Sequence, residues 1–279
     1  MRLGAFLLSD SQSAPPLIPS FPHLGPYKGL GTFVLNLDRC TTRLHHIFPL
    51  AQALGFPVHR LQAIEGSEAL FKYPQAIDHE TYGTLFGKSM GPGTFGCTLS
   101  HIKAWQTFLA SPYAFALILE DDVTFSPHLL RPIIQKLIQD AFLWDLCGMQ
   151  LNHRGAPLVV RSYPTFDLVL YLYPVTGAGG TLINRRAAER MLAKSWPLKM
   201  PNDHFFTRTW ELSLCFAGIQ PRPITQGVLP SEIQKAGREW PLPKNSKGLL
   251  LRALWTVQRS LFTFFYALIQ YKNKKWGKK

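Results

Sequence analysis

Cysteine is scarce in this chain of 279 residues, and no two cysteines lie close together in the sequence. The four are Cys40, Cys97, Cys147 and Cys215. Without a C-x-x-C pair, the spacing matches neither a zinc finger nor a disulfide framework. We therefore expect reduced and mostly buried thiols, as in a cytosolic protein. Residues 1–10 hold only a very short apolar run, and we expect no secretory signal there.

Acidic residues are also few, because 17 Asp and Glu stand against 30 Lys and Arg, and the formal net charge is +13. The imbalance is concentrated at the C-terminal end, where residues 244–279 hold nine basic side chains and no acidic one. Excess positive charge favours anionic partners. Since the rest of the chain is only mildly basic, the charge pattern does not indicate a nucleic-acid-binding protein.

No apolar run near the C-terminus has the about 20 uncharged residues that a membrane-spanning helix needs. Arg252 and Arg259 interrupt the segment 249–271. On a helix, its polar residues recur at steps of three and four and form one stripe: Arg252, Thr256, Arg259, Thr263, Tyr266 and Gln270. Large apolar residues cover the opposite side. This pattern predicts that residues 247–279 lie on an anionic membrane surface. A core helix with a solvated lysine tail is the alternative.

One stretch, residues 116–123, joins strongly apolar residues to three consecutive carboxylates. The apolar part predicts a strand buried on both faces, and ligands bind beyond the carboxyl ends of such strands in open α/β sheets. Adjacent acids repel one another, so a hard divalent cation is expected there. Because side chains alternate, Glu120 and Asp122 form the predicted ligand pair and Asp121 points the other way. A solvated acidic loop is the alternative.

The order of predicted elements indicates an α/β fold with a mostly parallel, Rossmann-type sheet and flanking helices. A strand at 32–37, a helix at 41–54 and a strand at 58–64 form a βαβ unit. Further strands are expected at 144–151, 168–173 and 176–183, and helices at 126–140, 185–194 and from 201 onwards. We expect three parts: an extended Pro- and Ser-rich arm at 1–31, a domain at 32–243 and a basic amphipathic tail at 244–279.

Two further segments carry candidate functional groups. Residues 67–93 are predicted to form an irregular insertion, after which a glycine-rich lead at 93–96 opens a helix whose N-terminal amides could contact a pyrophosphate. His101 in that helix is either a packed residue or a functional group. Asp203 and His204 begin a later helix, where the aspartate is a helix cap, a metal ligand or a catalytic group.

Four motifs resemble those of glycosyltransferase family 25, the lipooligosaccharide galactosyltransferases and their collagen-modifying relatives. They are residues 36–39 with Arg43, residues 63–66, residues 96–101 and residues 117–123. The resemblance covers roughly residues 32–235 and implies a GT-A-like fold, a nucleotide-sugar donor, inversion at the anomeric carbon, and Mn²⁺ or Mg²⁺. The sequence departs from the family pattern at Thr94, Thr181 and Asn202, which leaves the acceptor open.

The resemblance also implies roles for individual residues. The donor would be bound by residues at the first two strand ends and in the following helix: Asn36, Asp38, Arg39, Arg43, Glu65, Ser100 and His101. Glu120 and Asp122 would hold the metal, which His204 could complete. Inversion requires a base for the acceptor hydroxyl, for which Asp203 and Asp121 are the candidates.

The expected function is therefore transfer of a sugar, galactose by resemblance, from a UDP-sugar to a lipooligosaccharide- or LPS-type glycan. The acceptor would be an oligosaccharide or a lipid-linked glycan, with the protein peripheral on the inner face of the cytoplasmic membrane. Two alternatives remain. One is a non-catalytic membrane-bound protein that binds a glycan or nucleotide, and the other is a metal-dependent hydrolase or phosphotransferase.

Overall fold

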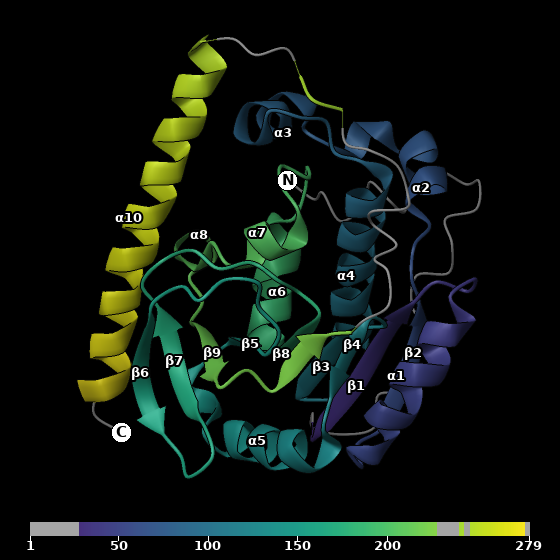
Figure 1. Cartoon of the computed structure of the whole chain (residues 1–279), viewed down its shortest axis with the longest axis vertical. Helices are drawn as coiled ribbons and strands as arrows, with labels where there is room; N and C mark the ends of the chain where they lie inside the picture. The colour runs from purple at the N-terminus through teal and green to yellow at the C-terminus, as the bar shows by residue number, and fades with distance from the viewer. Residues whose placement is uncertain (1–27, 228–239, 243–245, 277–279) are drawn as a thin grey trace.

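The computed structural model describes residues 28–227, 240–242 and 246–276, and a sheet of eight strands forms its centre (Figure 1). The strands follow the order β2-β1-β3-β8-β5-β9-β7-β6. Their bounds are β1 Leu30–Asn36, β2 Val58–Gln62, β3 Phe115–Glu120, β5 Leu146–Gly148, β6 Pro157–Ser162, β7 Asp167–Tyr171, β8 Gly180–Asn184 and β9 Phe216–Gln220. Only β7 and β8 run against the other six, so the predicted mostly parallel α/β sheet is confirmed.

Helices cover both faces of this sheet. The longer ones are α1 Thr41–Ala53, α4 Pro92–Ala110, α5 Pro127–Gln139 and α6 Arg185–Lys194. Alternation along β1 sends Val34 into one core cluster, with residues of α1 and α5, and Phe33 into another, with residues of α4 and α6. The protein therefore has three layers, with the sheet between α1 and α5 on one face and α4 and α6 on the other, and one core cluster fills each interface.

The topology indicates a ligand site at the carboxyl ends of two neighbouring strands, β1 and β3. After β1, the chain forms α1 and the parallel strand β2, and later returns to β3 on the other side of β1. The strand order therefore reverses between β1 and β3, whose carboxyl ends lie together because Leu35 pairs with Glu120. A reversal of this kind is where open α/β sheets bind ligands.

Residues 67–93, predicted to be irregular, are instead largely helical. Helix α2 spans Gly66–Lys72, a 3₁₀ turn spans Pro74–Ala76 and α3 spans His79–Phe86. Asp78 caps α3 by accepting a hydrogen bond from the Thr81 amide, and Gly87 ends it at φ 68°. The prediction was wrong because helices of seven or eight residues are too short to display clear periodicity.

The segment after Cys215, where no strand is predicted, contributes an interior strand. Strand β9 lies between β5 and β7. It was missed because it has only five residues and is followed by Pro221 and Pro223, which are typical of loops. Edge strand β6 was also missed. It begins at a proline and is interrupted by a register shift between Val159 and Arg161.

Several shorter elements complete the described structure. They are the strand pair β4 Val123–Phe125 and β10 Ile224–Gln226, the 3₁₀ turn Ala141–Leu143, and helices α7 Asn202–Phe206 and α8 Thr209–Leu212. Strand β1 begins at Leu30, inside the segment predicted to be an arm, and residues 1–27 of that arm lie outside the described residues.

The last helix, α10, spans Ser246–Trp276 and stands along one side of the molecule (Figure 1). It contacts α3, α8, β6 and β7. Among the described residues, no helix combines the length and apolarity that crossing a membrane requires.

Candidate active site

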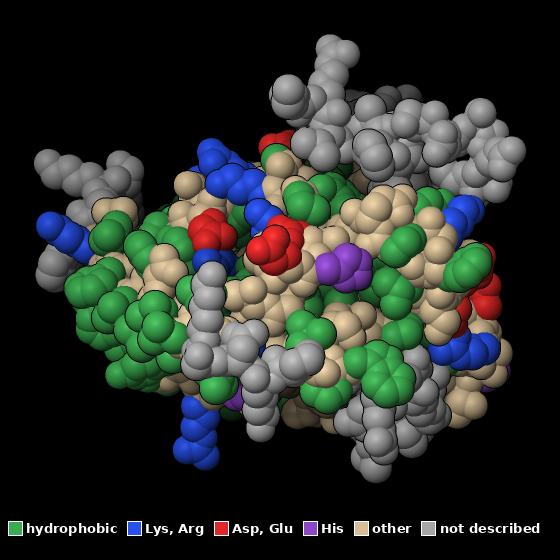
Figure 2. Space-filling view, turned by 90° about the horizontal axis from the view of Figure 1, so that it is seen from above, with side chains coloured by type: hydrophobic (Ala, Val, Ile, Leu, Met, Phe, Trp, Pro, Cys, Tyr) green, Lys and Arg blue, Asp and Glu red, His purple; other side chains and the backbone are tan. Residues whose placement is uncertain are grey.

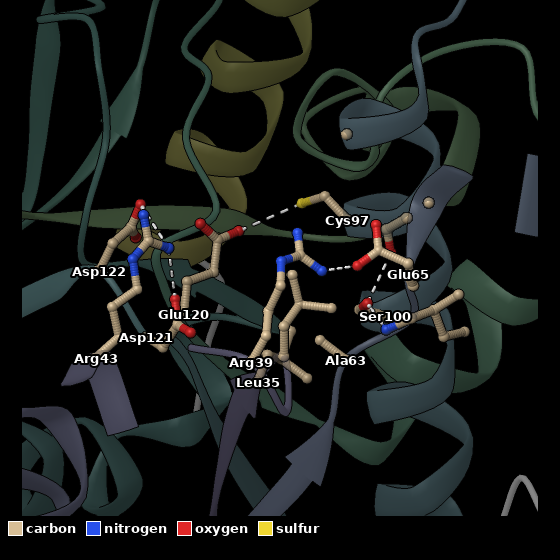
Figure 3. A pocket seen from close by; sticks show the side chains of 15 residues that line it. Leu35, Arg39, Arg43, Ala63, Glu65, Cys97, Ser100, Glu120, Asp121 and Asp122 are labelled. Carbon is tan, nitrogen blue, oxygen red and sulfur yellow. Dashed lines mark hydrogen bonds and ion pairs between the residues drawn. The ribbon is translucent and has the colours of Figure 1, made fainter. Parts of the chain in front are cut away.

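Two cavities meet at the carboxyl ends of β1 and β3. The smaller, of about 100 Å³, lies between the ends of β1, β2 and β3 and helix α4 (Figure 3). The larger, of about 680 Å³, extends toward α7 and the glycine turn at residues 177–179. Cys97, Glu120 and Asp122 line both cavities. A ligand that filled both would therefore pass the predicted metal pair.

Glu120 faces helix α4. Its Oε1 atom lies 2.9 Å from Nε2 of His101 and 3.6 Å from the Cys97 thiol. Burial alone would raise the pKa of Glu120, but the hydrogen bond and the electrostatic interaction with His101 lower it below its ordinary value. His101 is only 1% exposed, so it is a packed helix residue that also positions a carboxylate.

Asp121 points away from Glu120, toward β1 and α1, as alternation along the strand predicts. It accepts hydrogen bonds of 2.7 Å from Nδ2 of Asn36 and 2.9 Å from Nη1 of Arg43. Burial raises the pKa of Asp121, while Asn36 and Arg43 oppose that shift. Both Asp121 oxygens are thus engaged by neighbouring side chains. Asn36, which lines neither cavity, orders the strand ends and also accepts a hydrogen bond from Arg60.

Asp122 keeps one carboxylate oxygen without a partner. Its Oδ2 atom lies 3.4 Å from Nε2 of Gln226 and 3.9 Å from Nη1 of Arg43, whereas Oδ1 is buried and accepts no hydrogen bond. Burial and the charge of Glu120 raise the pKa of Asp122 to about 6. Arg43 thus supplies part of the positive charge that the three acids require, and Asp122 still lacks a counter-charge at Oδ1.

This donor set fits a divalent cation. A buried carboxylate oxygen without a hydrogen bond is costly unless a cation or donor reaches it, and carboxylates are the ligands that Mg²⁺ and Mn²⁺ prefer. Among the described residues, Cys97, His101 and Glu120 also place one ligand atom each within 4.8 Å of one another. Borderline ions such as Zn²⁺ accept that mixture of ligands.

His204 lines the larger cavity. Its Nδ1 atom is 3.1 Å from the guanidinium of Arg259 on α10, so Nδ1 accepts a hydrogen bond and Nε2, which carries the proton of the neutral ring, can donate one to a ligand. Burial, with further lowering by Arg259, takes the pKa of His204 to about 4 despite the opposing charge of Asp203. The imidazole is therefore neutral at pH 7.

Asp203 combines a structural role with a place in the cavity wall. Its carboxylate accepts hydrogen bonds from the amides of His204 at 2.8 Å and Gly177 at 3.1 Å. Gly177 has a φ of 121°, which only glycine adopts readily. Asp203 thereby fixes the glycine turn, which lines the larger cavity together with Glu120 and Asp122.

The donor-side residues separate into two groups. Arg39 and Glu65, from the ends of β1 and β2, form an ion pair in the wall of the smaller cavity (Figure 3). Asp38 instead bonds Arg60 and Gln62 of β2 and lines neither cavity.

Ser100 ties two elements together. Its hydroxyl donates to the Gly96 carbonyl and accepts from the Ile64 amide, which joins α4 to the segment after β2. Ser100 also lines the smaller cavity.

The glycine-rich lead is not where helix α4 begins. The helix starts at Pro92, so residues 93–96 are already helical, and the amides of Gly93 and Thr94 lie in its first turn. A Cβ on Gly96 would meet the Ile64 carbonyl at 2.6 Å and the Cα of Gly66 at 2.8 Å. The glycine therefore permits α2 and α4 to approach each other, while a pyrophosphate contact by the amides of the first turn stays a prediction.

Sequence reasoning missed Cys97, Gln226 and Arg259. Cys97 could have been found, because it precedes His101 by four residues and so shares its helix face. Gln226 and Arg259 come from β10 and α10. Both lie more than 100 residues after the acidic motif, and no sequence pattern indicates that they approach it.

Comparison with known proteins identifies the family. The model of "Glycosyltransferase family 25 (LPS biosynthesis protein)" matches residues 30–206. A "Glycosyltransferase 25 family member" of Drosophila melanogaster is 25% identical over 220 residues, which are 74% of this chain and 36% of that protein. The corresponding protein of Aedes aegypti is 29% identical over 184 residues, 62% of this chain and 30% of that protein.

Two further matches are a relative named as inactive and a solved structure. The human "Inactive glycosyltransferase 25 family member 3" is 29% identical over 154 residues, covering 48% of this chain and 25% of that protein. The crystal structure of S. aureus TarS 1–349 in complex with UDP-GlcNAc aligns with a TM-score of 0.43 and 11% identity, over 88% of this chain and 72% of that one.

The chain spans only about a quarter to a third of the length of the curated relatives that it matches. The family match, however, extends over more than half of this chain, from β1 to α7, and includes both sides of the larger cavity. The chain belongs to glycosyltransferase family 25.

Proposed function

We propose that the protein is an inverting glycosyltransferase that uses a UDP-sugar and a divalent cation, Mn²⁺ or Mg²⁺. The observation that carries this proposal is the buried, unpartnered Oδ1 of Asp122 beside Glu120, at the point where the strand order reverses. Glu120 and Asp122 would hold the ion. When bound, the ion would neutralise the charge that develops on the departing diphosphate.

The two cavities suit the two halves of the donor. The smaller cavity has an apolar floor at Leu35 and Ile64 and the Arg39–Glu65 ion pair in its wall, which suits the uridine and ribose. The larger cavity, lined by Asp203 and the glycine turn, suits the sugar and the acceptor. The diphosphate would then lie between them, beside Glu120 and Asp122.

The transfer reaction needs one proton acceptor. The acceptor hydroxyl forms a bond to the anomeric carbon from the face opposite the leaving group, while the bond from that carbon to the UDP oxygen breaks. The hydroxyl proton passes to a carboxylate base, and UDP leaves with the electron pair. We assign the base to Asp203, because it lines the larger cavity, whereas Asp121 lines only the smaller one and forms an ion pair with Arg43.

His101 and Arg43 act as positioning residues in this proposal. His101 holds Glu120 in its charged form, and Arg43 holds Asp121 and stands near Asp122. His204 is neutral and would contact the acceptor or a phosphate through Nε2. By family resemblance, the sugar is galactose and the acceptor is a lipooligosaccharide- or LPS-type glycan, reached at the inner face of the cytoplasmic membrane.

One observation favours a non-catalytic alternative. Because Arg43 already offsets part of the acidic charge, a protein that binds a nucleotide sugar without metal could retain this arrangement. A metal-dependent hydrolase is less well supported, since the described residues contain no second group of Asp, Glu, His and Cys beyond Cys97, His101 and Glu120.

The proposal is tested with the full-length protein and a panel of UDP-sugars, with Mn²⁺, Mg²⁺ or EDTA. We expect UDP release that requires metal and is lost in Asp122→Asn. Binding of a UDP-sugar by calorimetry without UDP release, with or without metal, would support the non-catalytic alternative. Release of UMP and a sugar 1-phosphate in place of UDP would support the hydrolase.

A further inference from the structure

Helix α10 packs on the domain with its polar side. Arg259 donates to the Val175 carbonyl and lies 3.1 Å from the Nδ1 atom of His204. The Trp255 ring lies 5.6 Å from that of Phe86 and 6.5 Å from that of His204. These contacts bury the side of the helix that an ordinary amphipathic helix turns toward water.

The opposite side of α10 is apolar and faces outward. A stripe of six side chains, which we call the outer stripe, is between 39% and 60% exposed: Leu250, Leu254, Val257, Leu261, Phe265 and Leu268. Their spacing by three and four residues places them on one face of the helix. Figure 2 shows hydrophobic side chains gathered at the left, on the side where α10 stands in Figure 1.

The outer stripe continues into positive charge. Lys272 and Lys275 follow Leu268 at steps of four and three, and both are exposed. Helix α10 contains no acidic residue along its whole length. The exposed face is therefore apolar over most of its length and basic at its C-terminal end, a combination that fits the acyl boundary and the anionic headgroups of a bilayer.

We propose that the outer stripe docks the protein on an anionic lipid bilayer, with α10 lying in the plane of the membrane surface. Since Arg259 and Trp255 on the inner side contact residues of the larger cavity, docking places that cavity beside the bilayer. The acceptor is then a glycan on a lipid anchor. The docking surface stands on its own, whereas this choice of acceptor rests on the proposed transferase function.

Point substitutions test the docking better than removal of the helix. Deleting α10 would remove the contact of Arg259 with His204 and so disturb the wall of the larger cavity. It would also uncover the core residues against which Ala267, only 7% exposed, packs. We choose Leu261→Glu/Phe265→Glu, which places two charges on the outer stripe. The matched control is Thr256→Glu/Asn273→Glu, which adds the same charge at exposed positions off the stripe.

The experiment is sedimentation of full-length protein with vesicles of phosphatidylcholine alone or with added phosphatidylglycerol, at low and high salt. We expect binding to the anionic vesicles only, weakened by salt. The outer-stripe variant should bind at least about tenfold more weakly, because charged side chains cannot enter the acyl boundary, while the control stays near wild type. Light scattering of each protein without vesicles reports self-association.

Three results would overturn the proposal. The outer-stripe variant and the control variant could bind anionic vesicles equally, or the wild-type protein could bind both vesicle types equally. The third is a protein that binds no vesicles but forms a dimer, which the outer-stripe substitutions abolish. The last would assign the stripe to a second copy of the chain. Vesicle binding without any UDP release would keep the docking surface and reject the transferase function. If transfer to a glycan presented on vesicles falls in the outer-stripe variant while UDP release with a soluble acceptor persists, the lipid-anchored acceptor is supported.

Discussion

His101 and Glu120 lie 19 residues apart in the chain, yet their side chains meet at 2.9 Å between Nε2 and Oε1. One comes from the middle of α4 and the other from the last residue of β3. The pair links the helix layer to the carboxyl edge of the sheet. It also fixes the carboxylate of Glu120 toward the two cavities, where a metal ion would need it.

The first prediction concerns this pair. His101→Ala should weaken Mn²⁺ binding about 10- to 100-fold, the usual effect of removing a group that orients a metal ligand. Calorimetric titration of the apoprotein measures it. His79→Ala, at an exposed histidine on α3, is the control. Unchanged Mn²⁺ affinity in His101→Ala would mean that Glu120 is not a ligand.

The second prediction concerns the charge of Asp122. Because its folded pKa is raised to about 6, the folded state holds a proton that the unfolded state releases between about pH 4 and 6. The wild-type apoprotein therefore loses stability from this group as the pH rises through that window. Asp122→Asn lacks this loss, so its advantage in free energy of unfolding should be on the order of 2 kcal/mol at pH 7 and vanish near pH 4.

Urea unfolding of both proteins with EDTA at pH 4 and pH 7 measures the difference. Added Mn²⁺ should reverse the order at pH 7, since only the wild type binds the ion and gains stability from it. An apoprotein in which Asp122→Asn is less stable than the wild type at pH 7 would contradict the assignment of an unpaired buried charge.

The third prediction concerns Arg43. Arg43→Ala should destabilise the fold by about 3–5 kcal/mol, because it leaves the buried carboxylate of Asp121 without its cation. Adding Asp121→Asn should recover part of that loss, since the amide carries no charge. Chemical denaturation of the two single variants and the double variant gives the coupling energy. Strict additivity would show that the two side chains do not depend on each other.

The fourth prediction concerns Asp203. If it is the base, Asp203→Asn should lower kcat far more than the affinity for the UDP-sugar, because the base acts on the acceptor in the transition state. The asparagine oxygen can still accept the hydrogen bond from the Gly177 amide, at the cost of the one from the His204 amide, so the turn should persist. A large loss of donor or metal affinity would make Asp203 a ligand, and no change in either would restrict it to holding the turn.

The fifth prediction concerns Gly96. Gly96→Ala should lower the thermal midpoint markedly, because the new Cβ would meet backbone atoms of Ile64 and Gly66, which cannot move as a flexible side chain can. Differential scanning calorimetry measures the shift. A variant with wild-type stability but weaker UDP-sugar binding would instead indicate that Gly96 matters for the donor and not for helix packing.

Local patterns were sufficient for much of the architecture. The βαβ unit, the buried strand before the carboxylates and helices α1, α5, α6 and α10 all follow from apolar periodicity and its end signals. Alternation along the extended chain also separated Glu120 from Asp121, and the steps of three and four defined the polar side of α10. These features depend on neighbours within about one or two helical turns, which the sequence displays directly.

Only the tertiary structure decided which distant groups meet. Gly96 lies against the backbone of Ile64 and Gly66, and strand β9 enters the sheet from a Pro-rich segment. The sequence indicated that α10 has a polar and an apolar side, but Arg259 at His204 determines that the polar side turns inward. Such outcomes depend on contacts between residues that the chain separates by tens to hundreds of positions, and no local periodicity records them.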